Sequence, residues 1–203
     1  LSAAERASLL LPPDTEDELI RHYAFGETDL SLIRQRRGDA NRLGVAVQLC
    51  LLRFPGQGLL PDASMPMSLL QWIGRQLRID PSCWPQYAER EETRREHLLE
   101  LRAYLGVEPF GLAHYRQAVH ATTELALQTD KGIVLAVNVL DTLRHRHIII
   151  PALDVIERVC AEAITRANRR IYEALSESLA DTHRRRLDDL LKRRDNGKTT
   201  WLA

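Results

Sequence analysis

The residues of this sequence that could do chemistry are mostly arginines, and they gather in clusters. The first cluster stands immediately before a long apolar run and consists of Arg34, Arg36, Arg37, Asn41 and Arg42. The guanidinium of arginine presents a planar set of donors that matches phosphate oxygens and the edge of guanine. At the start of a helix, free backbone amides add further donors for phosphate. The cluster therefore predicts contact with a nucleic-acid backbone. The alternative is a core helix with a solvated end.

Two further clusters have the same character. One precedes three consecutive isoleucines and consists of Arg144, His145, Arg146 and His147. The other lies on a predicted helix over 181–198 and contains basic triplets at 184–186 and 192–194. We also include two basic residues from the region around the second cluster among the candidate DNA-binding residues, namely Arg116 and Lys131. Surface arginines are commonly only solvated, so the prediction depends on finding three such clusters on one scaffold.

No arrangement of residues in the sequence predicts catalysis or a bound cofactor. His145 and His147 are two positions apart, so on a helix they face different directions, and no cysteine or carboxylate is suitably spaced to complete a metal site. The Gly-Lys-Thr run at 197–199 lacks the preceding glycine and strand of a phosphate-binding loop. GxSxG and HExxH motifs do not occur in the sequence. Asp141 lies on an otherwise apolar helix, and we expect it to pair with Arg144 or His145.

Local separation of charge, rather than net charge, would have to provide any DNA-binding surface. The 203 residues include 28 basic and 28 acidic side chains, for a formal net charge of zero. Residues 1–31 hold two basic and seven acidic side chains, whereas 32–53 hold five basic and one acidic. All but three of the basic residues are arginine. That bias suits phosphate binding, but it is also what a high-GC genome produces in all of its proteins.

The cysteines and the hydropathy indicate a cytoplasmic protein. Cys50, Cys83 and Cys160 are far apart and odd in number, so we expect reduced and mostly buried thiols. No apolar run approaches the roughly 20 residues that span a bilayer, so no membrane contact is expected. The chain begins without methionine and stops at residues 201–203 within what looks like a continuing segment. We therefore expect it to be a piece of a larger protein.

Helical periodicity and capping patterns predict an all-α fold. Leucine and alanine are abundant and aromatic residues make up 5% of the chain, a composition that favours helices. Ser2, with Glu5 three residues later, has the pattern of a capping box, and Asp39 can cap the helix that follows it. The predicted helices cover 2–11, 15–25, 27–37, 40–54, 68–78, a short turn within 80–88, 89–105, 112–129, 133–145, 151–179 and 181–198. The run at 148–150 is the one β-like stretch.

We divide the predicted helices into three regions. Residues 1–88 and 89–150 form two tandem, small helical domains of helix-turn-helix type, and both are expected to bind DNA. Residues 151–203 form a long helix followed by the basic helix. A helix of about 28 residues spans about 42 Å, which exceeds what one small domain needs. We expect it to brace the two domains or, alternatively, to pair with the same helix of a second copy in a homodimer.

The helix after the first cluster is apolar on nearly every side. Almost every residue from Leu43 to Phe54 is hydrophobic, and Gly44 leaves room for close packing. A helix that is apolar all round is buried, so this one cannot lie in a DNA groove. We expect it to form the centre of the first domain, with only the stretch before it placed to meet DNA. Replacing Arg36 and Arg37 should then weaken DNA binding with little loss of thermal stability, because exposed arginine contributes little to folding.

The run from Arg36 to Gly56 carries a family resemblance. Its pattern, RR-x-x-x-NRLG-x-A-x-QL-x-x-LR, resembles the N-terminal signature of transposases of the bacterial replicative, resolvase-encoding (Tn-three) transposon family. The segments 1–6 and 143–153 agree, and the resemblance covers essentially the whole chain. It implies a much longer parent protein whose N-terminal region binds the terminal inverted repeats of the element. It also implies that the RNase-H-like catalytic core, with its Asp-Asp-Glu triad and magnesium, lies outside this chain.

The sequence therefore predicts a DNA-binding module with no enzymatic activity and no cofactor of its own. Its expected partner is double-stranded DNA of the transposon ends, bound during DNA transposition. Arginines at helix N-termini would dock on the phosphate backbone, and one helix of each domain would face the major groove. The alternative is a helical module that assembles transposase subunits, in which the arginine clusters are only solvated.

Overall fold

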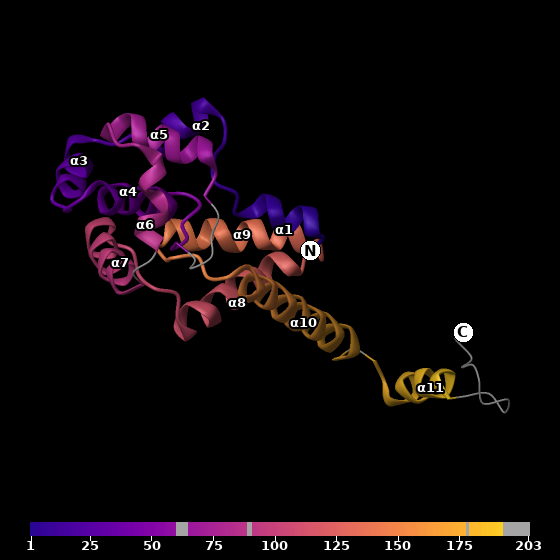
Figure 1. The fold of residues 1–203 in the computed structure, drawn as a ribbon. Coiled ribbons are helices and arrows are strands. Elements are labelled where there is room, and N and C mark those ends of the chain that lie inside the picture. The colour runs from indigo at the N-terminus through magenta and orange to yellow at the C-terminus, as the bar shows by residue number, and fades with distance from the viewer. Residues whose placement is uncertain (60–64, 89–90, 178, 193–203) are drawn as a thin grey trace.

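Helices make up nearly all of the regular structure. The computed structural model describes residues 1–59, 65–88, 91–177 and 179–192, and within these ranges it contains eleven α-helices, one short 3-10 helix and no sheet (Figure 1). The prediction of an all-α fold is confirmed. The β-like run at 148–150 contributes only an isolated parallel bridge between Ile148 and Glu108.

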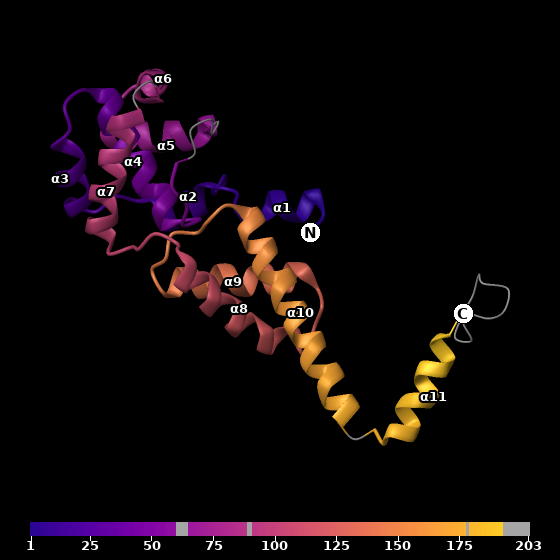
Figure 2. The same ribbon diagram turned by 90° about the horizontal axis from the view of Figure 1, so that it is seen from below.

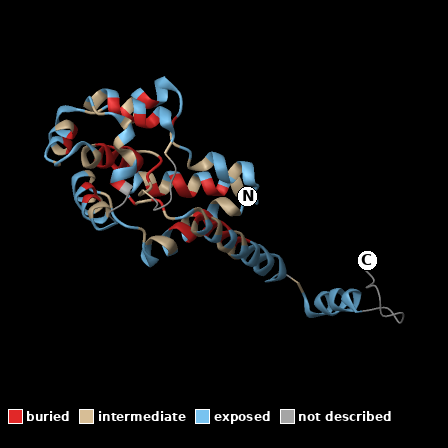
Figure 3. Cartoon of the chain, viewed as in Figure 1, coloured by how far each residue is buried: buried red, intermediate tan, exposed pale blue. Residues whose placement is uncertain are grey.

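One buried helix organises the first half of the chain. Every residue of this helix, α4, from Leu43 to Leu52 is buried (Figure 3), as its apolar composition predicted. Neighbouring helices pack against it from several sides. The elements of this part are α1 (Ala3–Leu9), α2 (Glu16–Tyr23), α3 (Glu27–Arg34), α4 (Asp39–Arg53), α5 (Met67–Leu77), the 3-10 helix η1 (Pro81–Cys83), α6 (Trp84–Ala88) and α7 (Glu91–Leu105).

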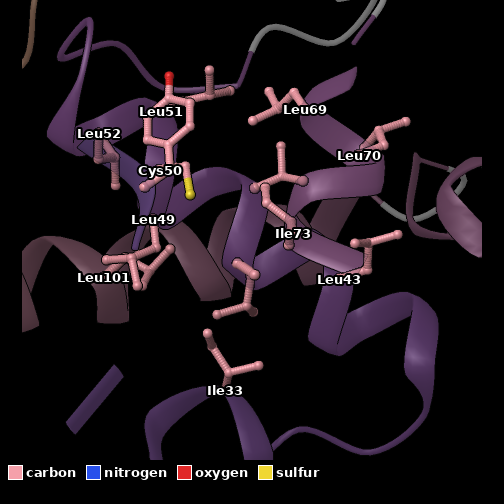
Figure 4. Close-up of a cluster of buried hydrophobic side chains, with 14 of the residues drawn as sticks. Ile33, Leu43, Leu49, Cys50, Leu51, Leu52, Leu69, Leu70, Ile73 and Leu101 are labelled. Carbon is pink, nitrogen blue, oxygen red and sulfur yellow. The ribbon is translucent and has the colours of Figure 1, made fainter. Parts of the chain in front are cut away.

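Side chains from several helices meet around α4 to form the first core (Figure 4). Leu49 and Cys50 of α4 have no exposed surface. Ile33 comes from α3, Ile73 from α5 and Leu101 from α7. Burying one such aliphatic side chain stabilises a fold by roughly 1.5–3 kcal/mol, so this cluster fixes the positions of the helices that carry the first group of arginines.

Gly44 allows α6 to approach α4 closely. A methyl group at this position would lie 2.2 Å from the ring of Tyr87. The ring is buried against α4, and its hydroxyl accepts a hydrogen bond from Gln48, one turn further along the same helix. The close packing expected at Gly44 is therefore confirmed.

A second core forms in the C-terminal half. Helices α8 and α9 pack against each other and against the first part of α10. Val119, Leu140 and Ile156, one from each helix, have at most 1% of their surface exposed. The elements of this part are α8 (Leu112–Ala126), α9 (Gly132–His145), α10 (Leu153–Glu177) and α11 (Asp181–Leu191).

The N-terminal helix joins this second core. It begins with the predicted capping box, in which the Glu5 amide donates to Ser2 Oγ at 3.2 Å. Leu9, at its end, packs against the second core. Arg6 forms an ion pair of 3.3 Å with Glu157 of α10. The first helix in the sequence is thus tied to the last part of the folded body.

The division into 1–88, 89–150 and 151–203 stays a prediction. Its first boundary adjoins residues 89–90, which lie outside the described residues. Helix α7 follows that boundary directly, and its Leu101 lies in the first core.

The long helix α10 extends beyond the second core (Figure 2). It has 25 residues, and its last buried residue is Ala167. The remaining turns are exposed, as is α11, which contains no buried residue (Figure 3). The predicted continuation of the basic helix over 193–198 lies outside the described residues. In the part of the chain that the structure describes, no helix combines the length and the apolar character needed to cross a membrane.

The turn between α3 and α4 differs from the prediction. The helix expected over 27–37 ends at Arg34. Gly38 occupies the N-cap position of α4 with a φ of 80°, a left-handed conformation that glycine adopts without strain. Asp39 is therefore the first residue of α4 rather than its cap. The two arginines between the helices consequently lie in an irregular turn.

Candidate nucleic-acid interface

Two of the arginines predicted at the first turn are open to solvent. Arg34 is the last residue of α3, and Arg37 lies in the turn before α4; both are exposed. Within the described ranges, the side chain of neither residue has a hydrogen-bond or ion-pair partner. A ligand could therefore reach both guanidinium groups without breaking an existing ion pair.

Arg36 is not exposed in the way we expected. Only 18% of its side chain is accessible, and its guanidinium forms an ion pair with Glu100 of α7. Its Nε is buried and makes no hydrogen bond to any described residue. The expectation that replacing Arg36 leaves stability nearly unchanged is thus wrong in its premise, because the side chain ties the turn to α7.

Arg42 and Asn41 hold the shape of the turn. Arg42 Nε donates a hydrogen bond of 2.9 Å to the carbonyl oxygen of Arg36, and its terminal nitrogen lies 3.5 Å from a carboxylate oxygen of Asp39. Asn41 Nδ2 donates to the carbonyl oxygen of Arg37 at 3.0 Å. The polar residues at the start of α4 therefore order the backbone that presents the exposed arginines.

One arginine that the sequence analysis did not single out lies beside this turn. Arg78 is exposed at the C-terminal end of α5. It lines the same cavity, of about 460 Å³, as Arg34 and Arg42. In the sequence it looks like an ordinary basic residue at a helix end, where it complements the helix dipole. Only the packing of α5 near α3 and α4 brings it to the predicted cluster.

Arg144, from the second predicted cluster, is used inside the protein. Its Nε donates a hydrogen bond of 3.0 Å to the carbonyl oxygen of Pro55, and its guanidinium carbon lies 5.2 Å from the ring centroid of Phe54. A terminal nitrogen pairs with Asp141 at 3.1 Å, as expected. Arg144 therefore connects the end of α9 with the chain that leaves α4.

The rest of the second cluster lies at one corner of α8 and α9. Arg146 donates a hydrogen bond of 2.9 Å to the side chain of Gln117, which places it next to the exposed Arg116 on α8. Lys131 is exposed at the opposite end of α9, about 20 Å away at 1.5 Å per residue. The structure thus brings Arg116 to the second cluster and keeps Lys131 apart from it.

The two predicted histidines of this corner are exposed. His145 Nδ1 lies 2.7 Å from the carbonyl oxygen of Asp141, one turn earlier on the helix. His147 has a φ of 55°, and its carbonyl oxygen accepts a hydrogen bond from the amide of Glu108. Among the described residues, no three His, Cys, Asp or Glu side chains are grouped to hold a metal ion.

A buried polar network lies behind the first cluster. Gln48 donates a hydrogen bond to the Tyr87 hydroxyl, which lies 3.1 Å from Nδ1 of His97. Burial raises the pKa of Tyr87 to about 12. Burial, with the nearby charge of Arg36, lowers the pKa of His97. A neutral imidazole can accept the tyrosine's hydrogen bond, so the network joins α4, α6 and α7 through uncharged groups.

The third cluster lies on α11. Arg184 donates a hydrogen bond of 2.8 Å to the carbonyl oxygen of Ser176, at the end of α10. Lys192, directly after α11, pairs with Asp189 of that helix at 2.5 Å. Residues 193–194, which complete the second basic triplet, lie outside the described residues.

Comparison with known proteins gives the chain a family. The model described as "Domain of unknown function (DUF4158)" matches residues 1–163. Over all 203 residues the chain is 64% identical to the transposase for transposon Tn21 of Escherichia coli and 56% identical to the transposase for transposon Tn501 of Pseudomonas aeruginosa. Over 191 residues, 94% of the chain, it is 33% identical to the transposase for transposon Tn1546 of Enterococcus faecium. The chain spans 20% of the length of the first two relatives and 19% of the third. The chain therefore belongs to the DUF4158 family, the N-terminal domain of Tn3-family transposases.

Proposed function

We propose that this chain is the DNA-binding part of a transposase and recognises the terminal inverted repeats of its transposon during DNA transposition. Its partner is duplex DNA, which locates its action in the bacterial cytoplasm at the nucleoid. Cleavage and strand transfer, with the Asp-Asp-Glu triad and the magnesium that they need, belong to a part of the longer transposase outside this chain.

The exposed arginines beside the α3–α4 turn are the observation that supports this proposal most directly. Arg34, Arg37 and Arg78 are exposed, and in the described structure their side chains have no ion-pair partner. Arg34 ends α3, Arg78 follows α5, and Arg37 lies in the turn before α4; α3 and α5 pack on α4, whose residues from Leu43 to Leu52 are all buried. Phosphate contacts of this kind fix the position of a protein on a duplex, while bases are read from the grooves.

The buried position of α4 restricts which elements can read bases. Its side chains from Leu43 to Leu52 have no access to a groove, so base readout falls to other helices. The first cluster lies at the N-terminal end of α4, and Arg144 marks its C-terminal end through the contact with Pro55. The 15 residues of α4 make a helix about 22 Å long, so its two ends are closer together than the roughly 34 Å of one DNA turn. A single duplex is therefore long enough to contact both clusters.

A second candidate function is assembly of transposase subunits. Ile171, Tyr172 and Leu175 on the outer turns of α10 are exposed large hydrophobic residues, and such residues commonly pack against another helix. A homodimer through this segment is compatible with DNA binding by the rest of the chain.

Equilibrium binding tests the proposal. The chain is titrated onto labelled duplexes of the terminal repeat and of a scrambled repeat with the same composition, at several salt concentrations. We expect tighter binding to the repeat and a steep loss of affinity with salt, because bound phosphates release counterions. Equal and negligible binding to both duplexes at low salt would refute DNA recognition and favour the assembly function. Addition of magnesium should produce no cleavage of either duplex.

A further inference from the structure

A cavity beside the α3–α4 turn is lined by three arginines. It lies between the end of α3, the start of α4 and the end of α5, and its volume is about 460 Å³. Arg34, Arg42 and Arg78 line it together with aliphatic side chains that include Ile33 and Leu77. Three guanidinium groups around one cavity make it a site that attracts an anion.

Two of the three arginines have no counter-charge in the described structure. The side chains of Arg34 and Arg78 make no ion pair there. Arg42 is oriented by its hydrogen bond to the Arg36 carbonyl oxygen, and its acidic neighbour is the exposed Asp39 at 3.5 Å. Like charges that share one cavity repel each other, and an anion between them removes that cost.

The backbone at Arg78 adds a second observation. This residue ends α5 in the left-handed conformation, with a φ of 57°. Helices commonly place glycine at such a position, because a residue with a Cβ is strained there. Strain at a residue that lines a charged cavity indicates a role for its side chain, here the delivery of a guanidinium to the cavity that Arg34 and Arg42 also line.

We propose that this cavity binds one phosphate group of the DNA backbone, held by the guanidinium groups of Arg34 and Arg78 with Arg42 as a third donor. The inference deepens the proposed function and rests on it, because the phosphate is taken to come from the transposon end. Planar guanidinium groups match the oxygens of phosphate and form charge-assisted hydrogen bonds with them. The volume of the cavity lies within the range of sites that enclose a small ligand, so the sugar next to the phosphate can enter with it.

The salt dependence of DNA binding reports how many phosphates the protein neutralises, so it can detect the loss of a single phosphate contact. We compare the wild-type chain with Arg34→Gln, Arg78→Gln and the double variant on the terminal-repeat duplex. Each neutralised phosphate contributes about 0.9 to the slope of log K against log salt. Since both arginines hold the same phosphate, the double variant should lose about one contact, a slope change near 0.9 rather than 1.8. We expect its affinity to fall about tenfold at moderate salt.

The matched control is Arg169→Gln. Arg169 is exposed on the outer part of α10 and forms a long ion pair of 3.8 Å with Glu173 on its own helix. This variant removes one positive charge, as each single glutamine variant does, but on the outer part of α10, so it should change neither the slope nor the affinity. The double lysine variant, Arg34→Lys with Arg78→Lys, keeps the charge and should restore most of the slope. Thermal melting of every variant shows that the fold is retained.

Two results separate this inference from the proposed function. If the wild-type chain binds the repeat but the double glutamine variant keeps its slope and affinity, the cavity does not hold a backbone phosphate, although DNA binding stands. If the wild-type chain binds no DNA, both the DNA source of the phosphate and the proposed function are refuted. Titration with inorganic phosphate and with a mononucleotide, followed by NMR of the arginine Nε–H signals, then distinguishes a free anion site from an empty cavity. Shifts confined to Arg34, Arg42 and Arg78 would support an anion site, and their absence would overturn it.

Discussion

Arg144 Nε donates a hydrogen bond to the carbonyl oxygen of Pro55, 3.0 Å away, and thereby joins the second core to the first. The same side chain lies over the Phe54 ring and pairs with Asp141. Near this contact, the amide of Ile150 donates to the carbonyl oxygen of Gly56 at 2.9 Å. A residue that the sequence suggests for DNA contact therefore has a clear structural task, which is to hold the two groups of helices together.

Replacing Arg144 should loosen this junction. For Arg144→Ala we expect a loss of about 2 kcal/mol in the free energy of unfolding, because a partly buried, charge-assisted hydrogen bond is removed and the Pro55 carbonyl loses a partner. Urea unfolding followed by circular dichroism measures the loss. Arg146→Ala is the control, since this neighbour is exposed and bonds to the side chain of Gln117; it should change stability by less than about 0.5 kcal/mol. Equal effects of the two variants would contradict the structural role of Arg144.

Adding one methyl group at Gly44 should destabilise the first core. In Gly44→Ala the new Cβ would lie 2.2 Å from the Tyr87 ring, so α6 must move away from α4. Overpacking of this kind costs about 1–3 kcal/mol, measurable as a lower melting temperature. At Gly111 a Cβ would meet nothing within 4 Å, so Gly111→Ala is the matched control and should melt close to wild type. A Gly44→Ala protein as stable as this control would show that α6 does not pack as described.

The two adjacent arginines of the α3–α4 turn should separate stability from DNA binding. Arg36→Ala breaks the ion pair with Glu100 and should lower stability by about 1 kcal/mol, a small value because Glu100 is 43% exposed. Arg37→Ala removes an exposed side chain and should leave the melting temperature unchanged while it weakens DNA binding. Melting and binding curves for both single variants test this. A large drop in melting temperature for Arg37→Ala would show that the turn is held differently.

Stability should decrease on mild acidification because of His97. Its pKa in the folded protein is lowered by burial and by Arg36, although Glu100 and Glu96 act in the opposite direction. The unfolded chain, with a histidine pKa of about 6.5, then binds more protons than the folded chain below that pH. The contribution of His97 is complete above about pH 6.5 and is lost as the pH falls through the lowered value. Protonation also removes the acceptor that faces the Tyr87 hydroxyl at 3.1 Å.

Unfolding free energies measured from pH 7.5 to 5 check this expectation. The wild-type chain should lose stability over this range, and His97→Gln should flatten the profile. A wild-type profile that stays level down to pH 5, or one that His97→Gln leaves unchanged, would contradict a buried neutral histidine.

The sequence predicts those parts of the fold that depend on local pattern. The apolar composition between Leu43 and Leu52 predicts a buried helix, because no face of it is polar enough to contact water. Ser2 and Glu5 predict the first helix start, since both partners of a capping box lie within one turn. The pairing of Asp141 with Arg144 follows in the same way from a spacing of three residues.

Features that depend on tertiary packing were not predictable. Arg78 reaches the cavity of Arg34 only because α5 folds back beside α3 and α4, and no spacing in the sequence records that contact. The inward direction of Arg36 depends on Glu100, 64 residues later. Arg144 and Pro55 are 89 residues apart. In each case the type of residue suggests a charged contact, and the three-dimensional arrangement decides whether its partner belongs to the protein or to a ligand.

Hydroxyl-radical footprinting on the terminal inverted repeat tests the central proposal most directly. At a saturating concentration of the chain, we expect protection of backbone positions within the repeat and none on a scrambled duplex. The Arg34→Gln, Arg78→Gln double variant should lose protection at one of these positions and retain the others. Uniform cleavage of the repeat in the presence of the folded chain would contradict the proposal that this domain recognises the transposon ends.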